Sequence, residues 1–244
     1  MAERLHKVLA TMGLGSRREI ERWIAQGLVK VDGQPARVGQ TDEGVTEVSV
    51  DGRKVILNTA VDTQFLQYHK PDDEICSRKD PQARKTVYEH LPALTSGRWI
   101  AIGRLDLTTS GILLFTTNGD LANALMHPSA QVDREYMVRV FGRVSPEVVE
   151  RLQRGVQLDD GLAKFTDIQM RPSKGSNQWL QVVLQEGRNH EVKRMFESQG
   201  LQVTRLIRIR FGPIALDEQL KKGQHRYLVK REIKELRALA EQAR

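Results

Sequence analysis

A carboxylate placed just before a fully apolar strand is the feature that most restricts how this chain can fold. The segment Gly103-Arg104-Leu105-Asp106 is followed within a few residues by the apolar run 111–115. Such a run is typical of a strand buried inside a sheet. A carboxylate beside it is costly to bury unless a cation or hydrogen-bond donors pair with it. We therefore expect the fold to bring a cationic partner to Asp106.

A basic segment later in the chain offers that partner. Residues 187–195 read Gly-Arg-Asn-His-Glu-Val-Lys-Arg-Met and open a helix expected over 191–199. Helical spacing keeps Lys193 off the apolar stripe of this helix, which fits either a site residue or a plain surface lysine. The sequence alone does not select the partner of Asp106 among the cations of this segment.

The charge balance points to a polyanionic partner. The chain has 244 residues with 38 Lys and Arg against 31 Asp and Glu, a net charge of +7. This surplus favours nucleic acid, although a basic protein without such a partner would show it too. Cys76 is the single cysteine, which fits a reducing compartment. The first residues lack the apolar core of a signal peptide and no apolar run reaches membrane-spanning length, so we expect a cytoplasmic protein that does not bind membranes.

The first 58 residues predict a small unit of two helices followed by hairpins. Apolar residues recur at helical spacing from Leu5 to Met12, and Ser16 with Glu19 matches a capping box that starts a second helix. Later Asp-Gly pairs are turn signals. The cations of this unit suit contact with an RNA backbone, although a solvated helix face explains them as well. They are Lys7, Arg17, Arg18, Arg22 and Lys30.

The remainder predicts an α+β fold with a mixed, mostly antiparallel sheet, because many strands occur with scattered helices that do not alternate strictly with them. A polar linker is expected over 58–64, which separates a domain over 1–58 from one over 64–244. The expected strands are 65–71, 99–102, 111–116, 134–141, 163–170, 179–185 and 203–211. The expected helices are 120–126, one starting at 146, 191–199 and one around 233–240.

Several common cofactor signals are missing. The sequence contains no Walker motif and no Cys-x-x-Cys, and its six histidines lack metal-ligand spacing. Asp159-Asp160-Gly161 lacks the other ligands of a calcium loop and is interpreted as a turn. We expect neither a metal nor another cofactor, so chemistry would rest on carboxylates, cations and rings.

Two families resemble parts of this chain. Segments 4–10, 15–19 and 27–33 resemble the S4 RNA-binding domain, which implies docking on structured RNA but no chemistry. Segments 103–119, 125–128, 134–136, 187–195 and 205–208 resemble the motifs of pseudouridine synthases, in the branch of small-subunit-type enzymes that carry an S4 unit. Segments 68–92 and 177–210 look most like the enzymes that act on 23S rRNA of the large subunit. The resemblance implies conversion of one uridine, in a 23S rRNA stem-loop, to pseudouridine by a monomeric enzyme.

The resemblance also implies roles for single residues. Asp106 would be the nucleophile toward a flipped uridine, with a nearby cation that keeps it ionised. Lys193 and Arg194 are both candidates for this cation, and we favour Lys193, which matches the family. Tyr136 would stack on the uracil and assist removal of the C5 proton, and Leu206 would contact the other side of the base. Without the resemblance, Asp106 would be interpreted as a turn residue and Tyr136 as a core residue.

Arginines complete the expected site. Arg104 would anchor a phosphate or fill the gap left by the flipped base, unless it only forms an ion pair with a neighbouring carboxylate. Arg188 would bind phosphate at a helix N-terminus. A period of two predicts that Leu206, Arg208 and Arg210 share one face of their strand.

Three other functions fit the same residues. The same reaction at another rRNA position would use the same motifs. A non-catalytic S4 protein of ribosome assembly would need none of Asp106, Tyr136 and Lys193. A uracil glycosylase would release free base instead of pseudouridine.

Overall fold

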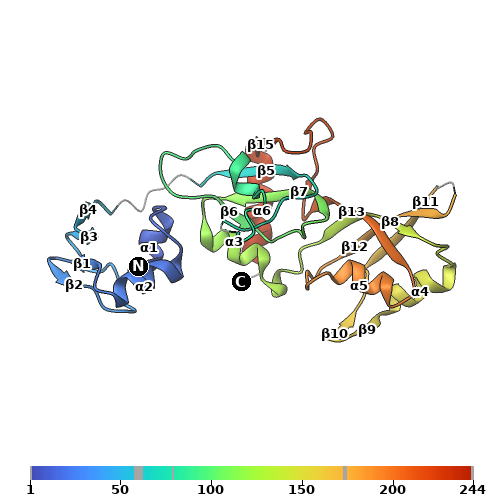
Figure 1. Ribbon diagram of the computed structural model, residues 1–244, viewed down its shortest axis with the longest axis horizontal. Coiled ribbons are helices and arrows are strands. Elements are labelled where there is room, and N and C mark those ends of the chain that lie inside the picture. Colours follow the sequence, from blue (N-terminus) through green and yellow to red (C-terminus); the bar gives the residue numbers. More distant parts are fainter. Residues whose placement is uncertain (1, 58–62, 79, 173–174, 243–244) are drawn as a thin grey trace. The chain divides into compact units, whose positions relative to one another are not determined.

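The computed structural model describes residues 2–57, 63–78, 80–172 and 175–242 (Figure 1). The chain forms two compact units, of which the first contains residues 1–64 with the segments 92–100 and 117–119, and the second contains the rest. A hydrogen bond from the Gly97 amide to the Met12 carbonyl, at 3.2 Å, ties the segment 92–100 to the first unit. Most of the predicted linker over 58–64 lies outside the described residues, so the predicted boundary stays a prediction.

The first unit has the predicted pair of helices and small hairpins. Ser16 accepts the Glu19 amide at 3.1 Å while the Glu19 carboxylate accepts the Ser16 amide, which confirms the capping box. The two-residue turn at Asp32-Gly33 has positive φ at both positions, as the tight hairpin requires. The elements are α1 (Leu5–Thr11), α2 (Arg17–Ala25), β1 (Val29–Val31), β2 (Gln34–Pro35), β3 (Val48–Val50) and β4 (Arg53–Val55).

The second unit is built on a 9-stranded sheet, and the chain as a whole is α+β as predicted. The main strand order is β11-β12-β8-β13-β7-β5-β15, with β14 beside β13 and β6 beside β7. β13 and β7 run parallel, whereas β11–β12, β12–β8, β8–β13, β5–β7 and β5–β15 are antiparallel. The strands are β5 (Phe65–Lys70), β6 (Ile100–Ile102), β7 (Thr109–Thr116), β8 (Arg134–Phe141), β11 (Asp167–Arg171), β12 (Asn177–Leu184), β13 (Gln202–Phe211), β14 (Ile214–Ala215) and β15 (His225–Tyr227).

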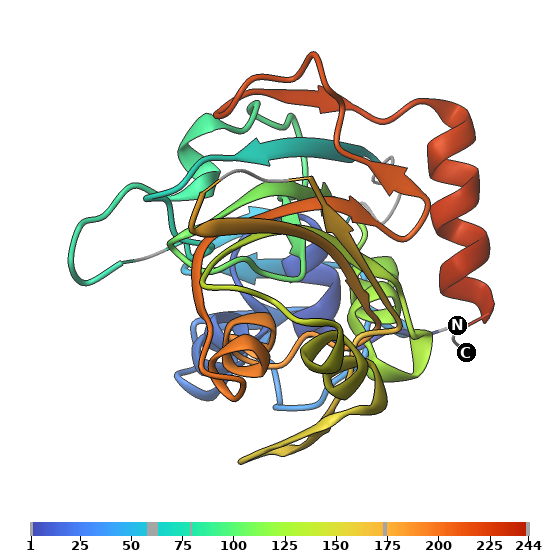
Figure 2. The same ribbon diagram turned by 90° about the vertical axis from the view of Figure 1, so that its right-hand side faces the viewer.

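Helices and one separate hairpin complete this unit. Figures 1 and 2 show α4 and α5 on one side of the strands β8, β11, β12 and β13. The side chains of β8 that point to this side, Val138 and Val140, are fully buried. The helical elements are η1 (Val87–His90), α3 (Gly119–Met126), η2 (Pro128–Ala130), α4 (Pro146–Arg154), α5 (Glu191–Glu197) and α6 (Lys230–Gln242), and the hairpin is β9 (Val156–Leu158) with β10 (Gly161–Ala163).

Strand β7 lies inside the sheet, between β13 and β5, and all of its residues are buried. Gly111 lies opposite Arg208 of β13 and has a φ of 110°. A Cβ atom at Gly111 would lie 2.1 Å from the Arg208 carbonyl oxygen and 2.6 Å from its amide nitrogen. The close approach of β7 to β13 therefore depends on glycine at this position.

The prediction of one strand over 163–170 was wrong. β10 ends at Ala163 and pairs with β9, whereas β11 begins at Asp167 and pairs with β12. Phe165 lies between them, is buried, and packs on Phe196 of α5 with 5.6 Å between ring centroids. Burial of this ring takes the chain out of the hairpin and into the main sheet.

The predicted common face of Leu206, Arg208 and Arg210 was wrong for Arg210. β13 has an irregularity between Arg208 and Arg210, and Arg210 lies opposite Glu135. The Arg210 guanidinium donates to the Glu135 carboxylate. The extra residue of a bulge reverses the alternation of side chains, so Arg210 lies on the other face from Leu206 and Arg208.

Candidate active site

Asp106 lies in the short loop between β6 and β7. The loop is closed by a hydrogen bond from the Thr109 amide to the Asp106 carbonyl, at 3.0 Å. Leu105 is buried beneath it, while the Asp106 side chain is 30% exposed. The carboxylate is therefore held on a fixed backbone but open to a ligand.

Two side chains from the basic segment lie beside this carboxylate. Lys193 Nζ lies 3.6 Å from Asp106 Oδ2 and donates to Thr108 Oγ1 at 2.8 Å. His190 Nε2 lies 3.5 Å from Asp106 Oδ1. The structure thus places Lys193, the favoured candidate, at Asp106, and it adds His190, which sequence reasoning did not select.

The other basic residues of the segment have different partners. Arg194 donates to Asp160 Oδ1 and Oδ2 at 3.0 and 2.7 Å, which lowers the pKa of this carboxyl group. Arg188 donates to Glu191, to Asp160 and to the Leu162 carbonyl. These contacts tie the β9–β10 hairpin to the start of α5, and the phosphate contact expected of Arg188 stays a prediction.

Tyr136 and Leu206 lie on the same face of neighbouring strands. Tyr136 is opposite Arg208, and Leu206 is opposite Val138, in the β8–β13 register. Leu206 is also the parallel partner of Thr109, three residues after Asp106. Both side chains are almost fully buried, at 8% and 5% exposure. An aromatic and an apolar side chain therefore lie along the strands that lead to the Asp106 loop.

Arg104 and several cations of the first unit are exposed. The Arg104 side chain forms no ion pair with any residue that the structure describes, which leaves its guanidinium open to a ligand. Arg17, Arg18, Arg22 and Lys30 are exposed on the first unit. Lys7 is partly buried and forms an ion pair with Glu3 at 2.7 Å.

Lys70 is a residue of the site that the sequence did not reveal. Its side chain is fully buried, and Nζ donates to the carbonyls of Pro71, Leu107 and Thr109 at 2.9, 3.3 and 2.9 Å. Burial lowers the pKa of Lys70, against the attraction of nearby acidic groups. The ammonium group thus fixes the backbone on the C-terminal side of Asp106. In the sequence, Lys70 appears only as the residue before the proline that ends a strand.

Replacement of Lys70 by Met should destabilise the protein by about 3 kcal/mol, because three carbonyl groups lose their donor in a buried place. The Asp106 loop should also become mobile. Urea unfolding measures the first effect, and hydrogen exchange at residues 105–109 measures the second. The matched control is Lys85→Met, at an exposed lysine, which should shift stability by less than about 0.5 kcal/mol. Equal stability of the two variants would contradict this assignment.

Cys76 supports the other side of the loop and should react slowly with alkylating reagents. Its Sγ lies 3.4 Å from both the Leu105 carbonyl oxygen and the Leu105 amide nitrogen. Burial raises the pKa of the Cys76 thiol, so little thiolate forms near neutral pH. Alkylation by iodoacetamide, followed by mass spectrometry at pH 8, should be much slower in the folded protein than in urea. Equal rates would show that the thiol is open to solvent.

Arg134 is a second residue with an unforeseen role. Its Nη1 donates to the carbonyls of Val132 and Gln185 at 2.9 and 2.5 Å, and its guanidinium lies over the Phe211 ring. Gly187 packs against the same guanidinium, since a Cβ there would lie 3.3 Å from Nε. Arg134 therefore positions the start of the segment that carries His190 and Lys193.

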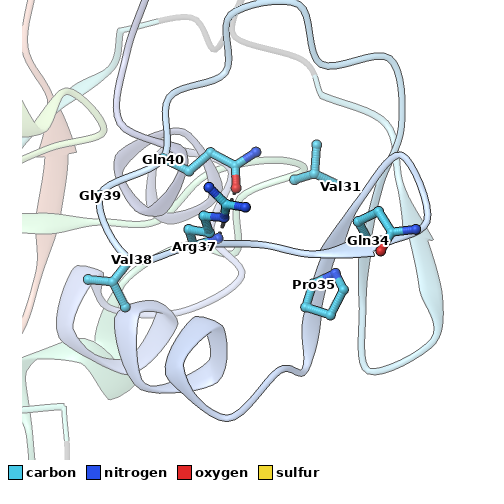
Figure 3. A pocket seen from close by; sticks show the side chains of 7 residues that line it. All are labelled: Val31, Gln34, Pro35, Arg37, Val38, Gly39 and Gln40. Carbon is cyan, nitrogen blue, oxygen red and sulfur yellow. Dashed lines mark hydrogen bonds between the residues drawn. The ribbon is translucent and has the colours of Figure 1, made fainter.

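A separate hollow lies in the first unit, beside the β1–β2 hairpin (Figure 3). Arg37 lies within it, and its amide donates to Gln40 Oε1 at 2.9 Å. The hollow contains none of the residues that surround Asp106. Its lining is Val31, Gln34, Pro35, Arg37, Val38, Gly39 and Gln40. Across the described ranges, no group of three or more His, Cys, Asp or Glu side chains is arranged to hold a metal ion.

Comparison with known proteins identifies the family. The RNA pseudouridylate synthase family model matches residues 64–198, and the S4 domain model matches residues 3–41. Ribosomal large subunit pseudouridine synthase B of Pseudomonas aeruginosa is 51% identical over 236 residues, covering 96% of this chain and 61% of that protein. The protein of the same name from Haemophilus influenzae is 54% identical over 226 residues, covering 91% of this chain and 63% of that protein. This chain thus spans less than two thirds of the length of these relatives.

A solved structure agrees with the sequence relatives. The crystal structure of a pseudouridylate synthase superposes with a TM-score of 0.67 at 26% identity, covering 96% of this chain and 99% of the other. The match therefore includes both units as well as the strands around Asp106. With an S4 domain in its first unit and this fold in its second, the chain belongs to the pseudouridine synthase family.

Proposed function

We propose that this protein converts a uridine of large-subunit rRNA to pseudouridine, with Asp106 as its catalytic carboxylate. The observation that carries the proposal is the Asp106 carboxylate, partly exposed on a braced loop and within 3.6 Å of Lys193 and His190. Family membership and relatives named as large-subunit synthases support the choice of reaction and of RNA.

The reaction needs few groups from the protein. The bond between N1 of uracil and C1′ of ribose breaks, the base turns, and C5 bonds to C1′. C5 then loses its proton and N1 gains one, so the product is an isomer of the substrate. A carboxylate can assist bond cleavage at the sugar or add to the base, and Lys193 Nζ lies 3.6 Å from the Asp106 carboxylate. The Tyr136 ring and the Leu206 side chain supply apolar contacts for the uracil, and the Tyr136 hydroxyl is available for proton transfer from C5.

RNA binding is divided between the two units in this proposal. The exposed cations Arg17, Arg18, Arg22 and Lys30 contact the phosphates of a 23S rRNA stem-loop, with Lys7 beside them. Arg104 contacts a phosphate or occupies the place of the flipped base, whose extrusion costs a few kcal/mol. The described part of the chain has no helix that could cross a membrane. We expect a monomer in the cytoplasm.

The proposal is tested by mapping pseudouridines in the 23S rRNA of a strain that lacks this protein. One site should be missing, and the purified protein should restore it on extracted rRNA. Chromatography of the reaction should show no free uracil, because a uracil glycosylase would release it. Loss of a small-subunit site would assign another substrate, and an unchanged map would reject the reaction.

A further inference from the structure

The sheet formed by β11, β12, β8 and β13 has two faces. The helices α4 and α5 lie on one face, and we call the other one the open face. Side chains on the helix-covered face, such as Val140, Leu180 and Val182, are fully buried. The open face is different, because Arg171 and Arg205 are exposed and Trp179 is partly exposed. This face is opposite to the one that carries Tyr136 and Leu206, so it is separate from the candidate active site.

A row of arginines with one tryptophan crosses the open face. Arg171 of β11 is opposite Trp179 of β12, Trp179 is opposite Arg139 of β8, and Arg139 is opposite Arg205 of β13. Residues opposite each other in antiparallel strands point to the same side of the sheet. Strands are about 4.8 Å apart, so the row extends roughly 14 Å.

The guanidinium of Arg139 is held within this row. Its Nε donates to Thr204 Oγ1 at 2.9 Å, and the Thr204 hydroxyl donates to the Arg139 carbonyl at 3.0 Å. The guanidinium carbon lies 5.9 Å from the centre of the Trp179 ring. Charge and ring are therefore placed side by side before any ligand binds.

A second aromatic ring extends the row. Phe141, two residues after Arg139 on β8, points to the same face and is 53% exposed. More than half of its surface is therefore open to solvent. Aromatic rings among arginines on an antiparallel sheet suit unpaired RNA, since rings stack on bases while guanidinium groups bind phosphates.

Acidic groups are confined to the other end of the open face. Asp167 and Glu135 lie four residues along their strands from Arg171 and Arg139, roughly 13 Å apart in backbone position. The Arg171 guanidinium extends toward this end and donates to Gln181, which donates to Glu135. Glu135 is bonded to Arg210 and Gln181, and Asp167 accepts from Gln169 at 2.9 Å. The end that carries the two rings is therefore cationic, and it is the end that complements a polyanion.

We propose that the open face binds an unpaired RNA segment, with Trp179 and Phe141 stacking on bases and Arg139 and Arg205 contacting phosphates. This goes beyond the proposed isomerisation, since binding here needs no chemistry at Asp106. In an rRNA substrate the segment would lie outside the stem-loop that presents the target uridine.

Fluorescence anisotropy with a labelled oligouridine of about 12 nucleotides tests the proposal, because single-strand sites cover about 4–16 nucleotides. Trp179→Ala should weaken binding about fivefold or more, and Trp179→Phe should retain most of the affinity because it keeps a ring. Arg139→Ala combined with Arg205→Ala should reduce the slope of log affinity on log salt by about 0.7 for each phosphate that the variant no longer neutralises. Photo-crosslinking with 5-iodouridine in the same RNA should label Trp179 or Phe141.

The matched control is Arg154→Ala, which removes one exposed arginine from α4, on the other side of the sheet. It should bind oligouridine almost as the parent does, and thermal unfolding should show that all variants are folded. Unchanged affinity in Trp179→Ala and in the double arginine variant would overturn the proposal. The proposal would also be overturned if these variants bound RNA unchanged but no longer bound another protein, because the face would then serve a protein partner. These readouts are independent of pseudouridine formation, so the failure of either proposal can be recognised separately.

Discussion

Asp106→Asn should abolish pseudouridine formation and leave RNA binding nearly unchanged. Asparagine has the same shape as aspartate, but it carries no charge to stabilise or attack a reacting carbon. Loss of a group that acts directly in the chemistry typically costs about 10⁴-fold or more in rate. Because the proposed RNA binding involves cations of both units, one neutral side chain should have little effect on affinity. Tritium release from 23S rRNA labelled at C5 of uridine measures the rate, and filter binding measures affinity.

The matched control for this variant is Asp159→Asn, at an exposed aspartate of the β9–β10 turn. It should retain full tritium release, because Asp159 is not part of the group around Lys193 and His190. Full activity in Asp106→Asn would remove this carboxylate from the chemistry. Loss of RNA binding together with activity would instead show that the variant disturbs the Asp106 loop as a whole.

Gly111→Ala should destabilise the protein by more than about 4 kcal/mol, in the range reserved for severe core defects. The new methyl group would meet backbone atoms of Arg208 at 2.1 and 2.6 Å, and a backbone cannot move aside as a flexible side chain can. The positive φ adds its own cost for any residue with a Cβ. Separation of β7 from β13 would also move Leu206 away from the Asp106 loop. Calorimetry should show a melting temperature lower by about 10 °C or more.

Gly223→Ala separates the two causes. Gly223 also has a positive φ, at 81°, but nothing lies within 4 Å of its added Cβ. This variant should therefore show only the backbone cost, roughly 1–2 kcal/mol. Equal destabilisation in Gly111→Ala and Gly223→Ala would show that the packing of β7 on β13 has room for a methyl group.

Local sequence signals predicted the elements better than their connections. The capping box at Ser16 and the turn at Asp32 depend on groups within a few residues, and both were confirmed. The strand over 163–170 failed because the Phe165 ring is drawn to α5, which a local pattern does not contain. The face of Arg210 failed because one extra residue in β13 reverses the alternation.

The candidate site was predictable in its chemistry but not in its support. The resemblance selected Asp106 and Lys193, and the structure places them 3.6 Å apart. It did not select Lys70, whose partners Leu107 and Thr109 are 37 and 39 positions away. The sequence predicted Asp160 to be an ordinary turn residue. In the structure its carboxylate accepts hydrogen bonds from Arg194, and Lys193, rather than Arg194, is therefore the residue that lies beside Asp106. Such contacts depend on three-dimensional packing, which no spacing within one segment reveals.

The parallel pairing of β7 with β13 also governs when the site can form during synthesis. The buried bond from Arg208 to the Ile112 carbonyl joins residues 96 positions apart, and Lys193 is likewise far along the chain from Asp106. Contacts over such distances form late, since a long loop must close first. A growing chain that ends before β13 therefore carries Asp106 without Leu206 and without the strand that pairs with the start of β7. The group of residues around Asp106 is thus complete only after β13 has left the ribosome.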